Sequence, residues 1–197
     1  MIRKPQGYDE MKVYDALEKL PTGGYVLKIL GVKIESYNWG EVLVMRIDVN
    51  EGEQAGFYQK NYEMQQENKK WKGTFRINLP KNDGSEQDSW AIKRLKAAMT
   101  AIEKSNEGYV WNWDENSLKG KIVGGLFGNK EYEYNGQRGF FTDCRTLCSV
   151  DRIRSGNFTI PADKMLKDSA NNGSVSGGFM TAEMPDSFEA IDEQVPF

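Results

Sequence analysis

The sequence predicts a mainly β domain with one main helix, followed by a flexible acidic C-terminal tail. Alternating apolar residues at several places predict strands, and an apolar stripe at helical spacing predicts the helix. From Pro161 onward the sequence is rich in Asn, Gly, Ser, Met and acidic residues, with too little apolar surface to fold alone. We therefore expect a folded domain over residues 1–161 and a disordered acidic tail over residues 162–197.

Several stretches before residue 80 predict secondary structure. Apolar residues at helical spacing predict a helix over residues 8–20, which Pro21 and the two glycines that follow Thr22 end. Residues 57–62 are predicted as the third strand of a meander. A short further strand is expected over residues 74–79. The first two strands of the meander are predicted over residues 25–35 and 42–49.

The second half of the domain combines the main helix with further strands. Residues 90–104 place apolar side chains on one face of a helix that Asp88 or Ser89 can cap. A β pattern resumes over residues 118–127, and residues 146–153 are predicted as the closing strand. Between them, Asn135-Gly136 is a strong signal for a turn that joins strands over residues 130–134 and 138–142.

This order of elements is that of a five-stranded OB-like Greek-key barrel. The main helix then lies between strands 3 and 4, and the hairpin is an addition. Small β-sandwiches share the same pattern. The loops over residues 63–74 and 128–139 are longer than a minimal OB fold needs, and long connections on such barrels are where ligands usually bind.

The charges of the chain are separated along its length. All 26 Lys and Arg residues lie within the first 167 positions, whereas the 30 residues after them contain six Asp or Glu and no cation. The chain contains no apolar run long enough for a transmembrane helix, and its first 20 residues lack the apolar core of a signal peptide. We therefore expect a cytoplasmic protein that has no contact with a membrane.

The sequence contains few residues suited to catalysis. It has no histidine, the commonest general base and metal ligand, and its two cysteines, Cys144 and Cys148, are too few for a zinc site. Phosphate-binding loops, nucleophile elbows and H-E-x-x-H motifs are also missing. We expect no enzyme, no cofactor and no metal.

Aromatic residues instead stand beside cations in several segments of the domain. Cations follow the phosphates of single-stranded nucleic acid, and aromatic faces stack its bases at about 1–3 kcal/mol each. Because stacking is insensitive to base identity, we expect sequence-tolerant binding. Some of these rings, in apolar strand context, could equally belong to the core. The candidate DNA-binding residues are Tyr37, Trp39, Tyr58, Lys60, Tyr62, Lys69, Lys70, Trp71, Lys72, Arg76, Tyr132, Tyr134 and Arg138.

The chain ends on DEQVPF, and this ending resembles the acidic C-terminal tip of bacterial single-stranded DNA-binding proteins. Phage single-stranded DNA-binding proteins also have acidic tails with a terminal phenylalanine, and residues 118–136 look like phage proteins of that group. Gln194-Val195 departs from the usual acidic residue and isoleucine. The resemblance implies that Phe197 enters an apolar pocket on a partner. The other implied partner-binding residues are Asp192, Glu193, Val195 and Pro196.

Together these features predict a single-stranded DNA-binding protein of phage type that protects the strand and recruits replication or recombination proteins through its tail. Its location would be the cytoplasm of a bacterial host cell. A phage structural or assembly protein and a metal-dependent nuclease are the alternatives, and homo-oligomer formation stays open. The acidic tail is expected to compete with DNA, so deleting residues 168–197 should tighten DNA binding, most visibly at low salt.

Overall fold

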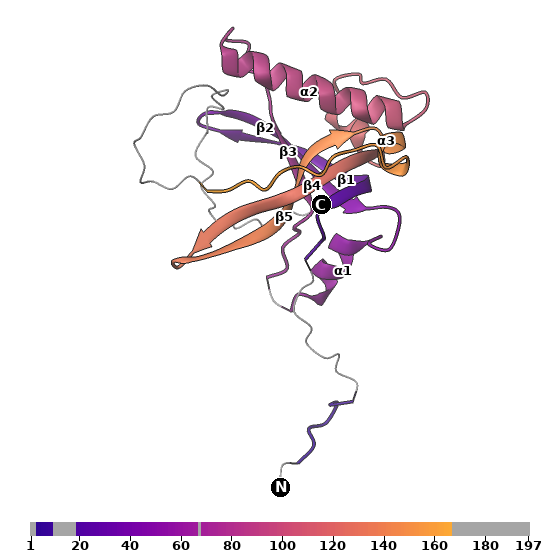
Figure 1. Cartoon of the computed structure of the whole chain (residues 1–197), viewed down its shortest axis with the longest axis vertical. Coiled ribbons are helices and arrows are strands. Elements are labelled where there is room, and N and C mark those ends of the chain that lie inside the picture. Colours follow the sequence, from indigo (N-terminus) through magenta and orange to yellow (C-terminus); the bar gives the residue numbers. More distant parts are fainter. Residues whose placement is uncertain (1–2, 10–18, 67, 167–197) are drawn as a thin grey trace.

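The computed structural model describes residues 3–9, 19–66 and 68–166. Its centre is a five-stranded antiparallel sheet with strand order β3-β2-β1-β4-β5 (Figure 1). The prediction of a mainly β fold is confirmed. In the described chain β3 and β5 are the two edges of the sheet, which is not closed. The strands are β1 (Gly23–Tyr37), β2 (Gly40–Val49), β3 (Thr74–Asn78), β4 (Ile122–Tyr134) and β5 (Gln137–Cys148).

The main helix, α2 (Glu86–Ser105), packs against β3, β4 and β5 and crosses the top of the molecule in Figure 1. It begins four residues earlier than expected, because Ser85 is the N-cap and its hydroxyl accepts the N–H of Asp88 at 3.1 Å. Asp88, a predicted cap, is buried within the first turn and accepts the N–H groups of Lys81 and Asn82 instead. None of the described helices is long and apolar enough to cross a membrane.

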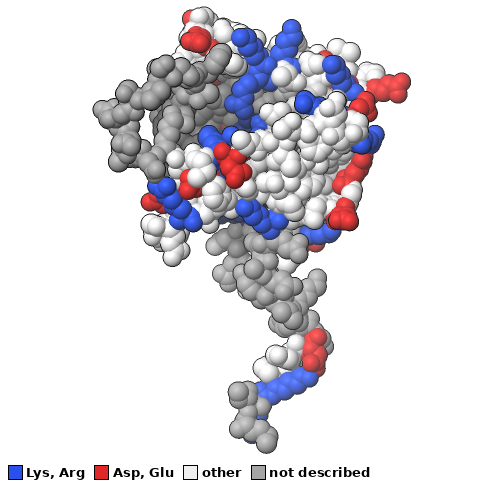
Figure 2. Space-filling model, in the orientation of Figure 1, with Lys and Arg blue, Asp and Glu red and all other residues white. Residues whose placement is uncertain are grey.

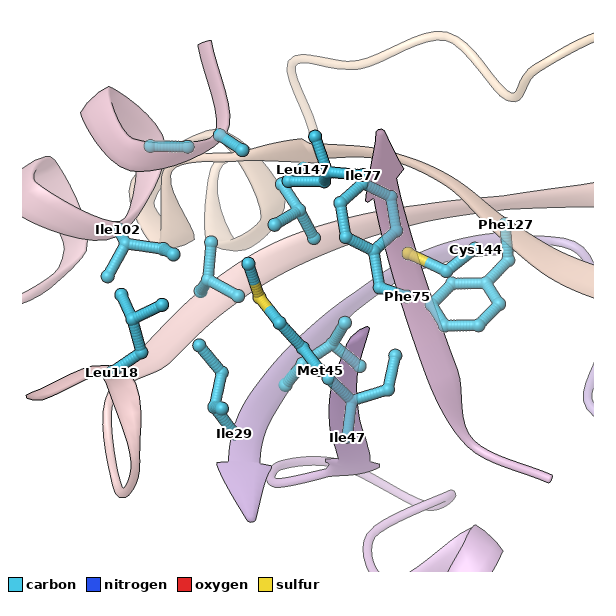
Figure 3. Close-up of a cluster of buried hydrophobic side chains, with 14 of the residues drawn as sticks. Ile29, Met45, Ile47, Phe75, Ile77, Ile102, Leu118, Phe127, Cys144 and Leu147 are labelled. Atoms are coloured by element: carbon cyan, nitrogen blue, oxygen red, sulfur yellow. The ribbon is translucent and has the colours of Figure 1, made fainter. Parts of the chain in front are cut away.

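The core lies between α2 and one face of the sheet (Figure 3). Alternate residues of the strands point into it, as the period of two requires. Burying each large apolar side chain contributes about 1.5–3 kcal/mol, so this layer fixes which face of each strand is left outside. Its most buried members include Leu27, Ile29, Met45, Ile47, Ile77, Ile102, Leu118 and Phe127.

One predicted strand is wrong and another is only partly right. Residues 57–62 belong to helix α1 (Phe57–Met64), because Gly56 turns the chain in the left-handed region and the buried Asp48 carboxylate accepts the N–H groups of Tyr58 and Gln59 at 2.9 and 3.2 Å. The third strand of the meander is therefore β3. Residues 146–153 are divided between the end of β5 and the short helix α3 (Val150–Arg154).

A 3-10 helix over Glu115–Leu118 occupies the start of the region predicted as β over residues 118–127, so β4 begins only at Ile122. The predicted helix over residues 8–20 includes residues 10–18, which lie outside the described residues.

The predicted hairpin is confirmed and is longer than expected. Asn135 and Gly136 both have positive φ, 50° and 74°, as a tight two-residue turn between twisted strands requires. The N–H of Lys164 donates to the Asn129 carbonyl at 2.9 Å, and the N–H of Leu166 donates to the Glu131 carboxylate at the same distance. The contacts of the folded domain thus reach Leu166, five residues beyond the expected boundary.

Candidate nucleic-acid interface

The strand register decides which predicted residues share a surface. Residues paired across an antiparallel ladder lie on one face, and Met45 of β2 faces the core. Its neighbour Arg46 therefore lies on the opposite, outer face. Val44 lies there too, between its partners Lys33 of β1 and Arg76 of β3. We call this outer surface of β1, β2 and β3, with the β1–β2 turn and the segment before β3, the sheet face.

A hydrogen-bonded cluster lies on the sheet face where β1 and β3 flank β2. Arg76 pairs with the Glu35 carboxylate and donates to the Tyr37 hydroxyl at 2.6 Å, while Lys33 reaches Glu35 at 2.9 Å. Burial alone would raise the pKa of Glu35, but hydrogen bonds from Tyr37 and Lys33 and the charge of Arg76 outweigh it and lower the pKa. The cluster therefore holds two cations against one carboxylate and is net positive.

The two rings of the β1–β2 turn stack on each other. The centroids of Tyr37 and Trp39 are 5.1 Å apart with only 3° between their planes, and Trp39 is 38% exposed. Burial, and next the hydrogen bond to Glu35, raise the pKa of Tyr37, so its hydroxyl stays protonated. Parallel rings with an exposed member provide a platform on which a base can continue the stack.

Trp71 supports a cation and does not offer a free platform. Its indole N–H donates to the Gly73 carbonyl at 2.8 Å, and the Arg46 guanidinium lies over its ring with Cζ 3.9 Å from the centroid. The ring of Tyr62 lies 5.8 Å away from that of Trp71. The sequence singled out Trp71 as a ring for stacking bases, whereas the structure shows its ring stacked against Arg46. Stacking on Trp71 fixes the orientation of the Arg46 guanidinium, a planar group that suits both phosphates and bases.

Tyr58 is removed from the candidate set. On helix α1 it points into the core, where it is 7% exposed, and burial raises the pKa of its hydroxyl above the ordinary value. Its ring therefore has no face to offer to a base. Lys60, two residues further along the same helix, is exposed. Tyr58 was a candidate because residues 57–62 were predicted as a strand, in which period-two alternation would have placed Tyr58, Lys60 and Tyr62 on one face.

The lysines before β3 are exposed beside Trp71, and several contacts hold their segment. The Gln65 side chain accepts the N–H of Lys70 at 2.7 Å and donates to the carbonyl of the same residue at 3.0 Å. The ammonium of Lys69 lies 5.7 Å from the centroid of Tyr62. Lys72 is exposed too, so the segment adds positive charge next to Arg46.

The remaining candidates lie on the arm, the part of the β4–β5 hairpin (residues 128–143) that extends beyond the end of β1. In Figure 1 it projects to the lower left, away from β2 and β3. Tyr134 is 71% exposed. Arg138 pairs with Glu133 at 3.0 Å and lies 3.9 Å from Glu131, so its charge is largely balanced. The ring of Tyr132 packs near that of Phe141, with centroids 6.1 Å apart.

The cysteines take no part in this surface. Cys144 and Cys148 are free and buried, and burial raises the pKa of both thiols. Across residues 3–9, 19–66 and 68–166, no group of three or more His, Cys, Asp or Glu side chains is placed to hold a metal ion. The five predicted tail residues, from Asp192 to Phe197, lie outside the described residues.

No protein-family model and no curated protein matches this chain.

Proposed function

We propose that this chain is a non-enzymatic, sequence-tolerant single-stranded DNA-binding protein of the OB type. The observation that carries the proposal is the sheet face. There Arg46 lies on Trp71, and Lys33 and Arg76 lie beside the stacked pair Tyr37 and Trp39. This surface combines cations on three adjacent strands with an exposed pair of stacked rings. Cations and exposed rings are what a protein needs to bind a single strand.

The order of the strands supports the OB assignment. In an OB fold the outer face of strands 2 and 3 and the loops between strands 1 and 2 and between strands 4 and 5 bind oligonucleotides. Here the meander β1–β2–β3, the pairing of β1 with β4 and the position of α2 between β3 and β4 follow that plan. Arg46 and Arg76 lie on the first of these surfaces, Trp39 in the β1–β2 turn and Tyr134 at the tip of the arm.

The tail completes the proposal. Its acidic residues and terminal phenylalanine fit a segment that recruits replication or recombination proteins of a phage or its bacterial host, as the resemblance of DEQVPF implies. The domain would then hold the strand, and the tail would hold the partner.

A titration with oligo-dT and with duplex DNA at several salt concentrations tests the binding. The expected result is tight binding of oligo-dT, weaker binding of duplex, and tryptophan quenching as bases stack on Trp39. The logarithm of the affinity should fall linearly with that of the salt concentration, by about 0.7 for each phosphate contact. Equal affinity for both DNAs, or no binding by a folded protein, would contradict the proposal.

A phage assembly protein is the second candidate, and the arm favours it. Tyr134, Tyr132 and Phe140 are exposed on a projecting hairpin that could pack against another subunit. Sedimentation analysis without DNA distinguishes the two functions. An assembly protein would form large oligomers that depend on Tyr134 and Phe140, and it would leave oligo-dT unbound.

A further inference from the structure

Helix α2 presents to solvent a surface that the sequence did not single out for binding. Trp90, Lys93, Arg94 and Ala97 follow one another at intervals that place them along one side of the helix, and all four are exposed. Trp90 is 47% exposed, and the ammonium of Lys93 lies 5.0 Å from the centroid of its ring. We call these four residues, with Lys104 two turns beyond Ala97, the α2 surface.

The middle turns of this helix carry only positive charge. Between Ser89 and Ile102 it carries Lys93, Arg94 and Lys96 and no acidic residue. In Figure 2 several Lys and Arg side chains gather at the top of the molecule, where Figure 1 places α2. A half-exposed tryptophan next to several cations is the combination that binds a single strand, since rings stack bases and cations follow phosphates.

The start of α2 is joined to the sheet face. The side chain of Lys81, in the loop between β3 and α2, passes over the β1–β2 turn, and its Cε lies 3.1 Å from the position that a Cβ on Gly40 would take. The buried carboxylate of Asp88 holds that loop, accepting the N–H of Lys81 at 2.6 Å and that of Asn82 at 3.1 Å. Cations thus continue from Trp39 past Lys81 towards α2.

We propose that the α2 surface is a second contact for single-stranded DNA that leaves the sheet face past Trp39 and Lys81. This inference rests on the proposed function and extends it, because it makes the binding site longer than the sheet face alone. An acidic peptide, such as this chain's own residues 186–197, also suits the charge of the helix. The connection through Lys81 to the stacked rings favours the nucleic acid.

Fluorescence anisotropy with oligo-dT of increasing length tests the proposal on the full chain. The variants are the double substitution Lys93→Gln with Arg94→Gln, and Trp90→Ala, with Trp90→Phe as the conservative partner. All of these variants should bind the shortest oligonucleotide that the wild type binds, with the affinity of the wild type. For long oligonucleotides the double variant should lower the salt slope by about 1.4, two contacts at about 0.7 each. Trp90→Ala should weaken binding about tenfold, and Trp90→Phe should restore most of the affinity.

Two matched measurements separate the outcomes. Lys119→Gln removes an exposed cation outside the α2 surface and should change nothing at any length. If the α2 variants lose the same affinity for oligonucleotides of every length, or lose none at any length, the inference is overturned. Tighter DNA binding by the double variant would do so as well, because it would show that an acidic segment occupies the helix. If Arg46→Gln weakens the binding of short oligonucleotides while every α2 variant binds all lengths as the wild type does, only this inference fails. If the folded wild type binds no oligonucleotide, the proposed function fails with it.

Discussion

The sheet face and the arm contain similar residues but present them differently. Both interleave aromatic rings with Lys or Arg in the sequence. On the sheet face Lys33 and Arg76 share the carboxylate of Glu35, and Arg46 stacks on the ring of Trp71. On the arm Arg138 lies between the carboxylates of Glu131 and Glu133.

The strand geometry explains this difference. On the arm, alternation and register bring Glu131 and Glu133 to the face of Arg138, whereas Lys130 and Tyr132 belong to the other face. On the sheet face the register brings Lys33 and Arg76 to either side of an apolar residue, Val44. A mixture of cations and rings in the sequence therefore becomes a positive surface only where the register brings more cations than acids to one face.

The largest expected effect comes from removing the cations of the sheet face. The double variant Arg46→Gln with Arg76→Gln should weaken oligo-dT binding by at least about 100-fold at low salt, because hydrogen bonds to charged groups contribute about 1.5–3 kcal/mol each. The salt slope should become shallower by about 1.4. The matched variant Arg138→Gln on the arm should change the affinity less than about threefold, since two carboxylates lie against Arg138, whereas Arg76 shares the carboxylate of Glu35 with Lys33. Equal losses in the two variants would remove the distinction between the regions.

Replacing the exposed ring of the β1–β2 turn should have the next largest effect. Trp39→Ala removes one stacking face and should weaken oligo-dT binding by about tenfold, with Trp39→Phe retaining most of the affinity. Trp113 is a control for general loss of an exposed indole, because it is 78% exposed outside the sheet face. Trp113→Phe should leave the affinity unchanged. With an oligo-dT too short to reach helix α2, the quenching should disappear in Trp39→Ala and persist in Trp113→Phe.

The sequence predicted much of this fold because local rules dominate there. The two-residue turn at Asn135-Gly136, the apolar stripe of α2 and the alternation of β2 are each decided by neighbouring residues. The strand prediction failed over residues 57–62 because the helix depends on Asp48, which caps it from another element. These capping contacts join residues ten and eleven positions apart and leave no periodic signal in the sequence.

The candidate site was predicted in composition but not in geometry. Trp71 and Arg76 are on the sheet face, as a binding role needs, but Tyr58 is core. Arg46 was missed because it follows Met45 in an apolar strand, and only the register shows that it points outward and stacks on Trp71. The neutralisation of Arg138 was equally hidden, because it depends on which residues face one another across the hairpin.

A smaller effect concerns the stability of the sheet face in acid. Because the folded pKa of Glu35 lies below its ordinary value of 4.5, its ionised carboxylate stabilises the fold at neutral pH. This contribution is lost as the pH falls from about 5 through the folded pKa. The free energy of unfolding, measured by urea titration, should therefore fall more steeply with acid in the wild type than in Glu35→Gln. The difference should stay below about 1 kcal/mol, because the partners of Glu35 are partly exposed. Parallel curves would show that this cluster does not stabilise the fold.

The smallest effect on DNA binding is expected from disturbing the arm. A Cβ on Gly139 would lie 2.7 Å from the hydroxyl oxygen of Tyr132, so Gly139→Ala must push that ring aside. Thermal unfolding should show that the free energy of unfolding falls by about 1 kcal/mol or less, because only the end of a side chain has to move. Oligo-dT affinity should change less than about twofold, since the cations of the sheet face are untouched. Tyr132→Ala, which removes the ring and keeps the glycine, should give the same unchanged affinity. If either variant weakens binding as much as Trp39→Ala, the arm belongs to the main contact surface and its balanced charges do not exclude it.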